Sequence, residues 1–371
     1  MRDAEVAVIG AGPAGTTLAA MLGEAGVSTI LLDRSTFPRD KPCGEGLMPA
    51  GADVLTRLDI SLAEFPTLDG VTYRVPEAGA AVGQFVKGRT GRAVRRLAFD
   101  QLLAARAAAT RFVDARFGCA VEGIERANGD IRVLTAGPAL TATYVVGADG
   151  LHSRVARWMG WSRPARGGRY ALVGHAAAPV HGIDRVIVTL LEGCEVYAAP
   201  TGPDELLLAV LGGKGRVRRD AYAGIVSSAH PEVRIAPNQE LRGAGPFWVR
   251  PSCVARRGVF LLGDAAGFLD PLTGDGMSDG MVAAQELARI IASRQHDAER
   301  AYRRWEARQW RRRAFVNRLA LTLTGSSTLA RRALRRLQQR PATLDRLLQI
   351  NDGSASLWSM TFRDWSALVG M

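Results

Sequence analysis

The sequence predicts an α/β fold in which a Rossmann-like domain carries an inserted β-rich domain and is followed by a helical C-terminal region. Three observations support this prediction. Short apolar runs lead directly into glycine-rich segments at three places far apart in the chain, and such runs are typical of strands buried in a parallel sheet. Four further apolar runs, separated by turn signals, lie between residues 170 and 211. After residue 299, apolar side chains recur at helical spacing.

The first glycine-rich segment follows an apolar run at residues 5–9 and opens an expected helix over residues 16–25. The segment consists of Gly10, Ala11, Gly12, Pro13, Ala14 and Gly15. Gly10 permits a tight turn, Gly12 lets the backbone approach a pyrophosphate, and Gly15 lets helix and strand pack closely. The free N–H groups at the helix start then face the phosphates. Strand, turn and helix therefore predict a dinucleotide-binding site.

A second strand is expected at residues 29–32, and it ends in Asp33, about 20 residues beyond the glycines. A carboxylate at this position can hold a ribose hydroxyl. Arg34 is a further candidate for cofactor binding, through a 2′-phosphate, with a solvated side chain as the alternative. A glycine-rich turn that binds nothing is the alternative to the whole site, and the acid at the end of the second strand argues against it.

Two more glycine-rich segments follow apolar runs, at residues 144–146 and 259–262. The second segment consists of Gly147, Ala148, Asp149 and Gly150, and the third of Gly263, Asp264, Ala265, Ala266 and Gly267. The third segment leads into Pro271, Leu272, Thr273, Gly274, Asp275 and Gly276. Three such segments in this order suit one long anionic cofactor, and they point to FAD.

A helix is expected to begin near Gly276, because apolar residues from Met277 to Ile291 have helical spacing. The positive end of its dipole faces back toward Pro271 and Gly274. A reduced flavin, which is anionic near N1, would be stabilised there. Met277 is a candidate flavin contact, with a core position as the alternative.

On these motifs the chain resembles flavoproteins of the glutathione-reductase-2 type, over roughly its first 300 residues. The group includes p-hydroxybenzoate hydroxylase-like monooxygenases, flavin-dependent halogenases and geranylgeranyl reductases. The resemblance implies non-covalent FAD and a transient visit by NAD(P)H as reductant. It also implies that residues 147–154, with Asp149, are the second fingerprint, and that Asp264 meets the FAD ribityl and pyrophosphate region.

Two further segments extend the resemblance. Residues 37–49 are similar to a loop that in the family passes close to the flavin, which would bring Cys43 and Gly44 to the isoalloxazine ring. For Cys43 a small buried thiol is the alternative. Residues 96–100 resemble a stretch whose arginine approaches the pyrophosphate, so Arg96, or its neighbour Arg95, is expected there.

The order of the motifs predicts a discontinuous domain organisation. The FAD-binding domain is expected at residues 1–75, 95–165 and 250–298, the substrate domain at residues 76–94 and 166–249, and the C-terminal helical region at residues 299–371. In the substrate domain, strands are expected at residues 170–176, 186–191, 195–199 and 206–211, with a helix at residues 216–228. In the family this sheet roofs the flavin and holds the substrate.

Composition narrows the class of protein further. The four cysteines, at positions 43, 119, 194 and 253, form no pattern typical of a disulfide framework or a zinc site, and no metal is expected. No apolar run reaches the length of about 18 residues needed to cross a bilayer, and the chain starts directly on a strand. We therefore expect a cytoplasmic enzyme.

Charge is concentrated in one segment. Residues 300–340 hold 13 arginines and one acid, Glu306, so their net charge of +12 equals that of the whole chain. The expected explanation is a helix with one solvated face, because tryptophans and leucines supply an apolar side. Peripheral contact with an anionic membrane or an acidic carrier protein is the alternative. No recognised nucleic-acid motif accompanies the charge, so nucleic acid is not expected as a partner.

The flavin supplies the bond-making chemistry, and the protein supplies positioning and electrostatics. An NAD(P)H- and O2-dependent monooxygenase is the leading hypothesis, acting on an aromatic, polyketide-like or other lipophilic small molecule, as in secondary metabolism. An ene-type reductase of a prenyl or lipid substrate is the alternative. A non-catalytic flavin-fold binding protein is a lesser one.

Two family patterns bear on this choice. The halogenase segment Trp-x-Trp-x-Ile-Pro is absent from the sequence. Of the prenyl-reductase stretch Pro-x-x-Tyr-x-Trp-x-Phe-Pro, Tyr197 and Pro200 match, whereas Ala198 and Ala199 stand for the Trp and Phe. We expect these alanines to widen the substrate cavity. Candidate catalytic residues are Tyr197, Glu45 and His175, each of which could act as a base or hydrogen-bonding group and each with a structural alternative.

Overall fold

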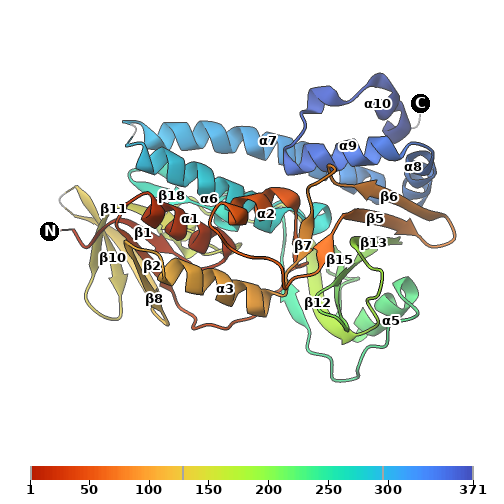
Figure 1. Ribbon diagram of the computed structural model, residues 1–371, viewed down its shortest axis with the longest axis horizontal. Helices are drawn as coiled ribbons and strands as arrows, with labels where there is room; N and C mark the ends of the chain where they lie inside the picture. The colour runs from red at the N-terminus through yellow and green to blue at the C-terminus, as the bar shows by residue number, and fades with distance from the viewer. Residues whose placement is uncertain (1, 128, 295, 370–371) are drawn as a thin grey trace.

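The computed structural model describes residues 2–127, 129–294 and 296–369 (Figure 1). Its first sheet has a parallel centre in which β1 (Ala4–Ile9) lies between β2 (Thr29–Asp33) and β11 (Leu140–Gly147). The sheet is extended by β8 (Val113–Phe117), β18 (Val259–Leu261), β17 (Ala255–Arg256), β10 (Asp130–Thr135) and β9 (Val121–Ala127). Val6, Ala7 and Val8 are fully buried, as expected of a strand covered on both faces. The predicted Rossmann-like sheet is confirmed.

Helix α1 (Pro13–Glu24) follows β1 and packs against α6 (Gly276–Ala292) and α3 (Arg96–Ala108). It begins three residues earlier than the predicted helix, because proline is well suited to the first helical position, where its missing N–H is not needed. Helix α6 begins at Gly276, where the sequence places it. The shorter helices are α2 (Pro49–Thr56), which packs on α6, and α4 (Arg154–Trp158).

A second sheet lies beside the first, at the right of Figure 1. Its order is β16 (Arg242–Ala244), β12 (Arg169–Ala177), β15 (Glu205–Gly213), β14 (Cys194–Pro200), β13 (Arg185–Leu191), β5 (Gly70–Val75) and β6 (Gly79–Gln84). Strands β12 to β15 occupy the four expected positions. The predicted helix at 216–228 is α5 (Arg219–Ala229), which starts later because a turn at residues 213–216 follows β15.

The boundary that we placed at residue 75 needs correction. Residues 70–75, expected in the first domain, form β5, which pairs in parallel with β13. They therefore belong to the second sheet. A small sheet of β3 (Gly46–Leu47), β7 (Gly91–Ala93) and β4 (Thr67–Leu68) lies at the junction of the two halves.

The central strands of the second sheet are buried on both faces. Alternate residues of β14 point to opposite sides, so Val196 and Ala198 join the core under α5, whereas Tyr197 and Ala199 join the core on the other side. Ala198 therefore cannot widen a cavity on the face of Tyr197. The expectation that both alanines do so is wrong for Ala198.

The C-terminal region consists of α7 (Ala298–Thr324), α8 (Ser327–Gln339), α9 (Pro341–Asp352), a short turn η3 (Leu357–Ser359) and α10 (Phe362–Val369). Helix α7 packs along α6 and then reaches the Pro271 turn, while α8 and α9 cover β5 and β6. Val316, Leu334 and Leu344 join the core of the second sheet. The region therefore ties the two sheets together. Among the described residues, no helix is long and apolar enough to cross a membrane.

Candidate cofactor and active site

The three glycine-rich segments meet at the carboxyl edge of the first sheet. Ile9 pairs with Gly147, and Gly147 pairs with Leu261, so the chain leaves all three strands at the same level. A Cβ at Gly10 would lie 2.4 Å from the carbonyl oxygen of Ala148, which shows how closely the first two segments touch. This edge of an open parallel sheet is where ligands bind.

The glycines of the first segment serve different purposes. Gly10 has φ +108°, which other residues adopt only with strain, and a Cβ at Gly15 would lie 1.9 Å from the carbonyl oxygen of Gly10. Gly12 is different, since a Cβ there would meet only Nη2 of Arg39, at 3.8 Å. Gly10 and Gly15 are thus required by the fold, whereas the open side of Gly12 leaves room for a ligand.

Asp33 lies directly beside this turn. Its Oδ2 accepts a hydrogen bond of 2.7 Å from the backbone N–H of Ala11, and Nη2 of Arg39 lies 3.4 Å from the same oxygen. Arg34 is exposed and forms no hydrogen bond or ion pair with any described residue. The cation near the glycine turn is therefore Arg39, which sequence reasoning missed. Its only signal was its place in the loop at residues 37–49.

Asp149 in the second segment accepts hydrogen bonds from the first backbone N–H groups of α4. Its Oδ2 accepts hydrogen bonds from the backbone N–H groups of Arg154, at 2.6 Å, and Val155, at 3.1 Å. Its Oδ1 is buried and has no hydrogen-bond partner among the described residues. A bound polar group would satisfy that oxygen, because buried polar atoms are nearly always hydrogen-bonded.

Asp264 and Arg96 lie near each other on the same side of the site. Desolvation raises the pKa of Asp264 to about 6, against the opposing influence of Arg96 and Arg313, and its carboxylate accepts no hydrogen bond from the described residues. Arg96 is buried and forms a two-pronged ion pair with Asp100, with N···O distances of 2.7 and 2.8 Å. A Cβ at Gly263 would lie 3.2 Å from that of Ala14, so the third segment also packs on α1.

The turn before α6 is held from two sides. The hydroxyl of Tyr197 donates to the carbonyl oxygen of Leu272, and the amide of Asn351 donates to that of Thr273 at 3.3 Å. Gly274 has φ +70°, the left-handed conformation that suits glycine. Pro271 opens this turn, and Gly276 and Met277 are the first two residues of α6. Tyr197 therefore positions this turn, and burial raises the pKa of its hydroxyl well above the usual value.

Glu45 and His175, predicted separately, are brought together. Nε2 of His175 lies 2.9 Å from Oε2 of Glu45, and the other carboxylate oxygen accepts 2.9 Å from the backbone N–H of Arg96 and 3.3 Å from Arg95. Glu45 is 1% exposed and has φ +55°. The pair joins the loop at residues 37–49 to β12 of the second sheet. Sequence reasoning could not foresee this contact across 130 residues.

Cys43 lies two residues before Glu45, next to Gly44. Its sulfur accepts a hydrogen bond of 3.4 Å from the backbone N–H of Glu45, and Arg96 is close by. Burial raises the pKa of the Cys43 thiol, although Arg96 opposes the shift. The thiol therefore stays protonated at neutral pH.

The residues present fit FAD at this edge. Gly12 leaves room for a phosphate, Oδ1 of Asp149 is buried without a partner among the described residues, and Asp264 carries an unbonded carboxylate where hydroxyl groups would donate. Helix α1 directs its free N–H groups to the same place. The fold and this site define a protein that binds FAD.

Comparisons with known proteins agree. Residues 3–181 match the FAD binding domain family. The chain is 29% identical over 322 residues to a menaquinone reductase of Mycolicibacterium smegmatis, covering 78% of this chain and 76% of that protein. It is 28% identical over 316 residues to digeranylgeranylglycerophospholipid reductase 1 of Methanothermobacter thermautotrophicus, covering 78% of each. A geranylgeranyl bacteriochlorophyll reductase-like protein of Thermoplasma acidophilum has the same fold, with a TM-score of 0.80 at 19% identity over 99% of both chains.

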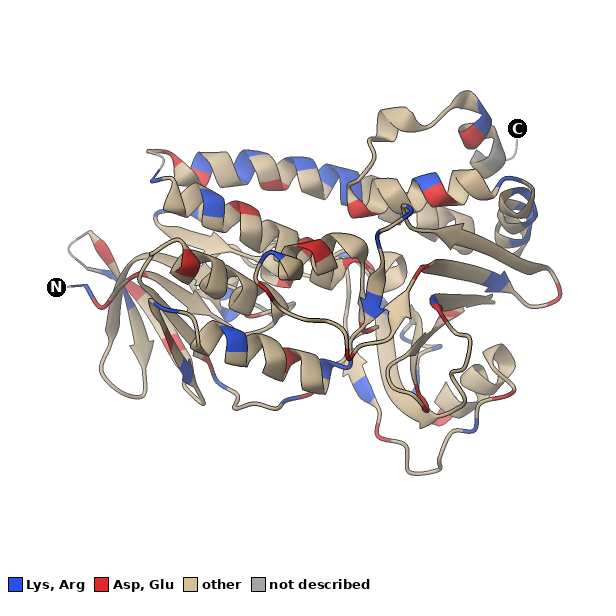
Figure 2. Cartoon of the chain, viewed as in Figure 1, with Lys and Arg blue, Asp and Glu red and all other residues tan. Residues whose placement is uncertain are grey.

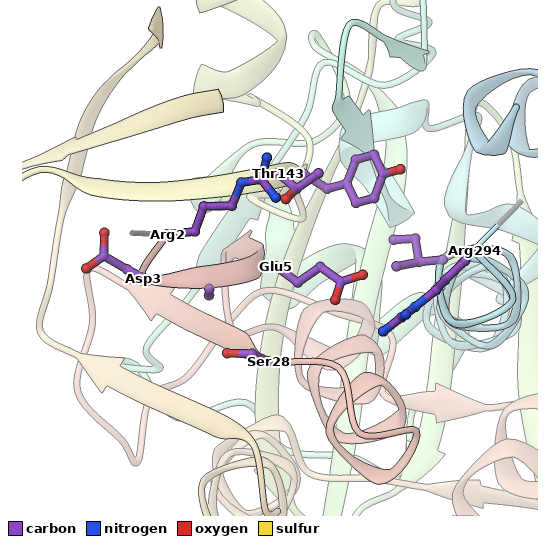
Figure 3. A pocket seen from close by; sticks show the side chains of 9 residues that line it. Arg2, Asp3, Glu5, Ser28, Thr143 and Arg294 are labelled. Atoms are coloured by element: carbon purple, nitrogen blue, oxygen red, sulfur yellow. The ribbon is translucent and has the colours of Figure 1, made fainter. Parts of the chain in front are cut away.

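Residues 3–181 therefore carry an FAD binding domain, and this match together with the reductases that the chain resembles supports an FAD-dependent oxidoreductase. A surface hollow of about 420 Å3 lies at the other end of the parallel strands, lined by Arg2, Asp3, Glu5, Ser28, Thr143, Tyr144 and Arg294 among others (Figure 3). Asp3 and Glu5 lie at the start of β1, away from the edge where the glycine-rich segments meet. We therefore assign no cofactor or substrate to this hollow.

Proposed function

We propose that this protein uses NAD(P)H to reduce a carbon–carbon double bond of a prenyl or other lipophilic substrate. Both relatives described above are named as reductases, one of a quinone and the other of a geranylgeranyl lipid. The single structural observation that carries the proposal is the pairing of Glu45 with His175 beside the protonated thiol of Cys43. This cluster can supply a proton in a desolvated place.

Saturating a double bond requires a hydride on one carbon and a proton on the other. FAD, once held at this site and reduced by NAD(P)H, would supply the hydride. The chain must supply the proton and exclude water from the reacting carbons. Cys43 holds a proton at neutral pH, and its sulfur is contacted by the backbone N–H of Glu45. The thiolate left after donation would be reprotonated from solvent, and the adjacent Glu45–His175 pair is the proposed route. Cys43 is therefore the proposed proton donor, and Glu45 and His175 are the proposed relay.

The face of the second sheet that carries Tyr197 is apolar and is packed in the core of this structure, so a substrate would reach it by displacing neighbouring side chains. Ala199 pairs with Leu207, which pairs with His175, so the relay histidine continues a row of apolar side chains. Val173, Ala209 and Tyr197 form the adjacent row. A lipophilic chain can lie against such a surface without leaving polar groups unpaired.

Hydroxylation by an O2-dependent monooxygenase remains the second candidate. The observation that favours it is Ala199, a small residue where the prenyl-reductase pattern has an aromatic one, on the face shared with Tyr197. A flat aromatic substrate is compatible with a small side chain at this position, which is fully buried in the structure. A purely binding role is disfavoured, because Gly12, Asp149 and Asp264 keep the features that hold FAD.

Product analysis separates the two reactions. Purified FAD-loaded protein is incubated with NADPH or NADH and either a geranylgeranyl lipid, a menaquinone or a lipophilic phenol, with and without O2. We expect a product in which a carbon–carbon double bond of the lipophilic chain, and not the quinone ring, has gained two hydrogen atoms, and which forms equally well without O2. A product that gains one oxygen atom, and only in air, would replace this proposal with the monooxygenase.

The proton donor has its own test. Cys43→Ala should lower turnover at least about tenfold while FAD content is unchanged, since acid catalysis typically contributes a factor of this size or more. Cys119→Ala, at a half-buried thiol elsewhere, is the control and should be neutral. A rise in KM alone in Cys43→Ala, with kcat unchanged, would show that Cys43 takes no part in the proton-transfer step.

A further inference from the structure

We propose that the outer face of α7, together with η3 and α10, binds the surface of an anionic lipid bilayer. The inference does not depend on the reaction proposed above. It rests on a positive stripe, on exposed aromatic side chains at its end and on the absence of exposed acids between them among the described residues.

Helix α7 divides its arginines between two faces. On the inner face, Arg313 lies 3.5 Å from Asp279 and 3.4 Å from Glu306, while Arg312 lies 3.7 Å from Asp279. On the outer face, Arg304, Arg308 and Arg311 are exposed and form no ion pair with any described residue. Their spacing of four and then three residues places them in one row along the helix.

The same row ends in aromatic side chains. Phe315 is four residues beyond Arg311 and 39% exposed, and its ring lies 5.9 Å from that of Trp365 in α10. This contact joins the arginine row to the end of the chain, where Phe362 is 84% exposed and Trp358, in η3, is 96% exposed. In Figure 1, α7 and α10 lie along the same upper edge of the molecule.

Exposed acids do not offset this charge in the described part of the region. Among residues 300–369, the acids are Glu306, Asp345, Asp352 and Asp364, and none is exposed. Three of them form ion pairs, with Arg250, Arg89 and Arg346 respectively, and Asp345 accepts a backbone hydrogen bond from Gln84. Figure 2 shows arginines along α7 and at α8. Beyond the first turn of α7, whose N-cap Asp297 is exposed, the outward charge of residues 300–369 is therefore positive.

This combination suits a membrane better than an acidic protein. Tryptophan and phenylalanine beside arginine are typical of the boundary between headgroups and acyl chains, where an apolar ring inserts and the cation stays in water. Two protruding rings on a short segment can insert into a fluid layer without a matching pocket. An acidic carrier would need no such rings.

The experiment is sedimentation with vesicles of phosphatidylglycerol and phosphatidylcholine, compared with vesicles of phosphatidylcholine alone. We expect binding to the anionic vesicles that falls steeply between about 0.1 M and 1 M salt, as the Debye length shrinks from about 10 Å to about 3 Å. The charge-reversal variant Arg304→Glu, Arg308→Glu, Arg311→Glu should lower the partition coefficient at least about tenfold. The aromatic variant Trp358→Ala, Phe362→Ala should also lower it, with the salt dependence preserved.

Matched controls lie on other surfaces. Lys214→Glu, Arg219→Glu, Arg234→Glu reverses three exposed charges on the α5 side, and Leu97→Ala, Phe112→Ala removes two exposed apolar side chains elsewhere. Both should bind vesicles as the wild type does, and all four variants should keep their FAD and melting temperature. The proposal fails if the wild type does not bind anionic vesicles at low salt, or if the control charge reversal abolishes binding equally. Salt-sensitive binding to an acidic protein, without vesicle binding, would also overturn it.

Discussion

At the scale of single residues, some glycines near the cofactor site are required by the fold, whereas another leaves room for a ligand. Gly10 and Gly15 have no space for a side chain, whereas Gly12 faces only the far end of Arg39. Sequence reasoning named all three, because a strand, a glycine turn and a helix form a strictly local pattern. It could not tell which of them the fold itself requires.

Two substitutions test this difference. Gly12→Val should leave the FAD-free protein folded with a melting temperature close to that of the wild type, while abolishing retention of FAD. Gly15→Ala should lower the melting temperature of the FAD-free protein, because its Cβ would lie 1.9 Å from a backbone oxygen. Circular dichroism and the flavin absorbance of the purified proteins measure both effects. Equal destabilisation by the two changes would contradict the assignment.

Asp264 gives a prediction about pH. In FAD-free protein its folded pKa of about 6 lies above the ordinary 3.8, so the folded state binds more protons between these values. Stability contributed by this group therefore falls as pH rises from about 4 to about 6. Asp264→Asn removes the effect, so the FAD-free variant should match the wild type near pH 4 and melt at a higher temperature at pH 7. It should also retain FAD poorly. A difference in melting temperature that does not change with pH would argue against a desolvated carboxylate.

At the scale of elements, α7 is one helix whose inner face packs on the protein and whose outer face is exposed. Its inner row is tied to α6 and to Arg250, which donates to the carbonyl oxygen of Ala266 in the third glycine-rich segment. Burial, reinforced by Asp275, raises the pKa of Asp279 to about 7 in spite of the arginines beside it. The sequence predicted one packed and one solvated face from the apolar spacing. It did not show which arginines are buried, because Asp279 lies on another helix.

Substitutions of neighbouring arginines should therefore differ in their effect on the free energy of unfolding. Arg313→Ala removes a buried partner of Asp279 and Glu306 and should cost about 3 kcal/mol or more in the free energy of unfolding. Arg311→Ala, two residues earlier on the outer face, should change that energy by less than about 0.5 kcal/mol. Urea unfolding of the two variants measures the difference. Similar small effects would mean that Arg313 is solvated.

At the scale of the whole molecule, the chain forms two large sheets that lie side by side. The order of motifs predicted the discontinuous first domain and the strands of the second sheet, because each signal lies within a few residues. Pairings between distant segments could not be read in the same way. β5 joins β13, whose sequence lies more than 100 residues away, and Glu45 meets His175 across a similar separation. The candidate relay therefore became visible only in three dimensions.

The central claim is that FAD held at this site passes hydride to a lipophilic alkene. The most direct test is to reduce the FAD-loaded protein with NADPH without O2, remove excess NADPH, and mix it with a geranylgeranyl substrate while following flavin absorbance. We predict that substrate reoxidises the flavin in the absence of O2, in proportion to the saturated product formed. A flavin that stays reduced until O2 is admitted, with every substrate tried, would contradict the claim and favour the monooxygenase.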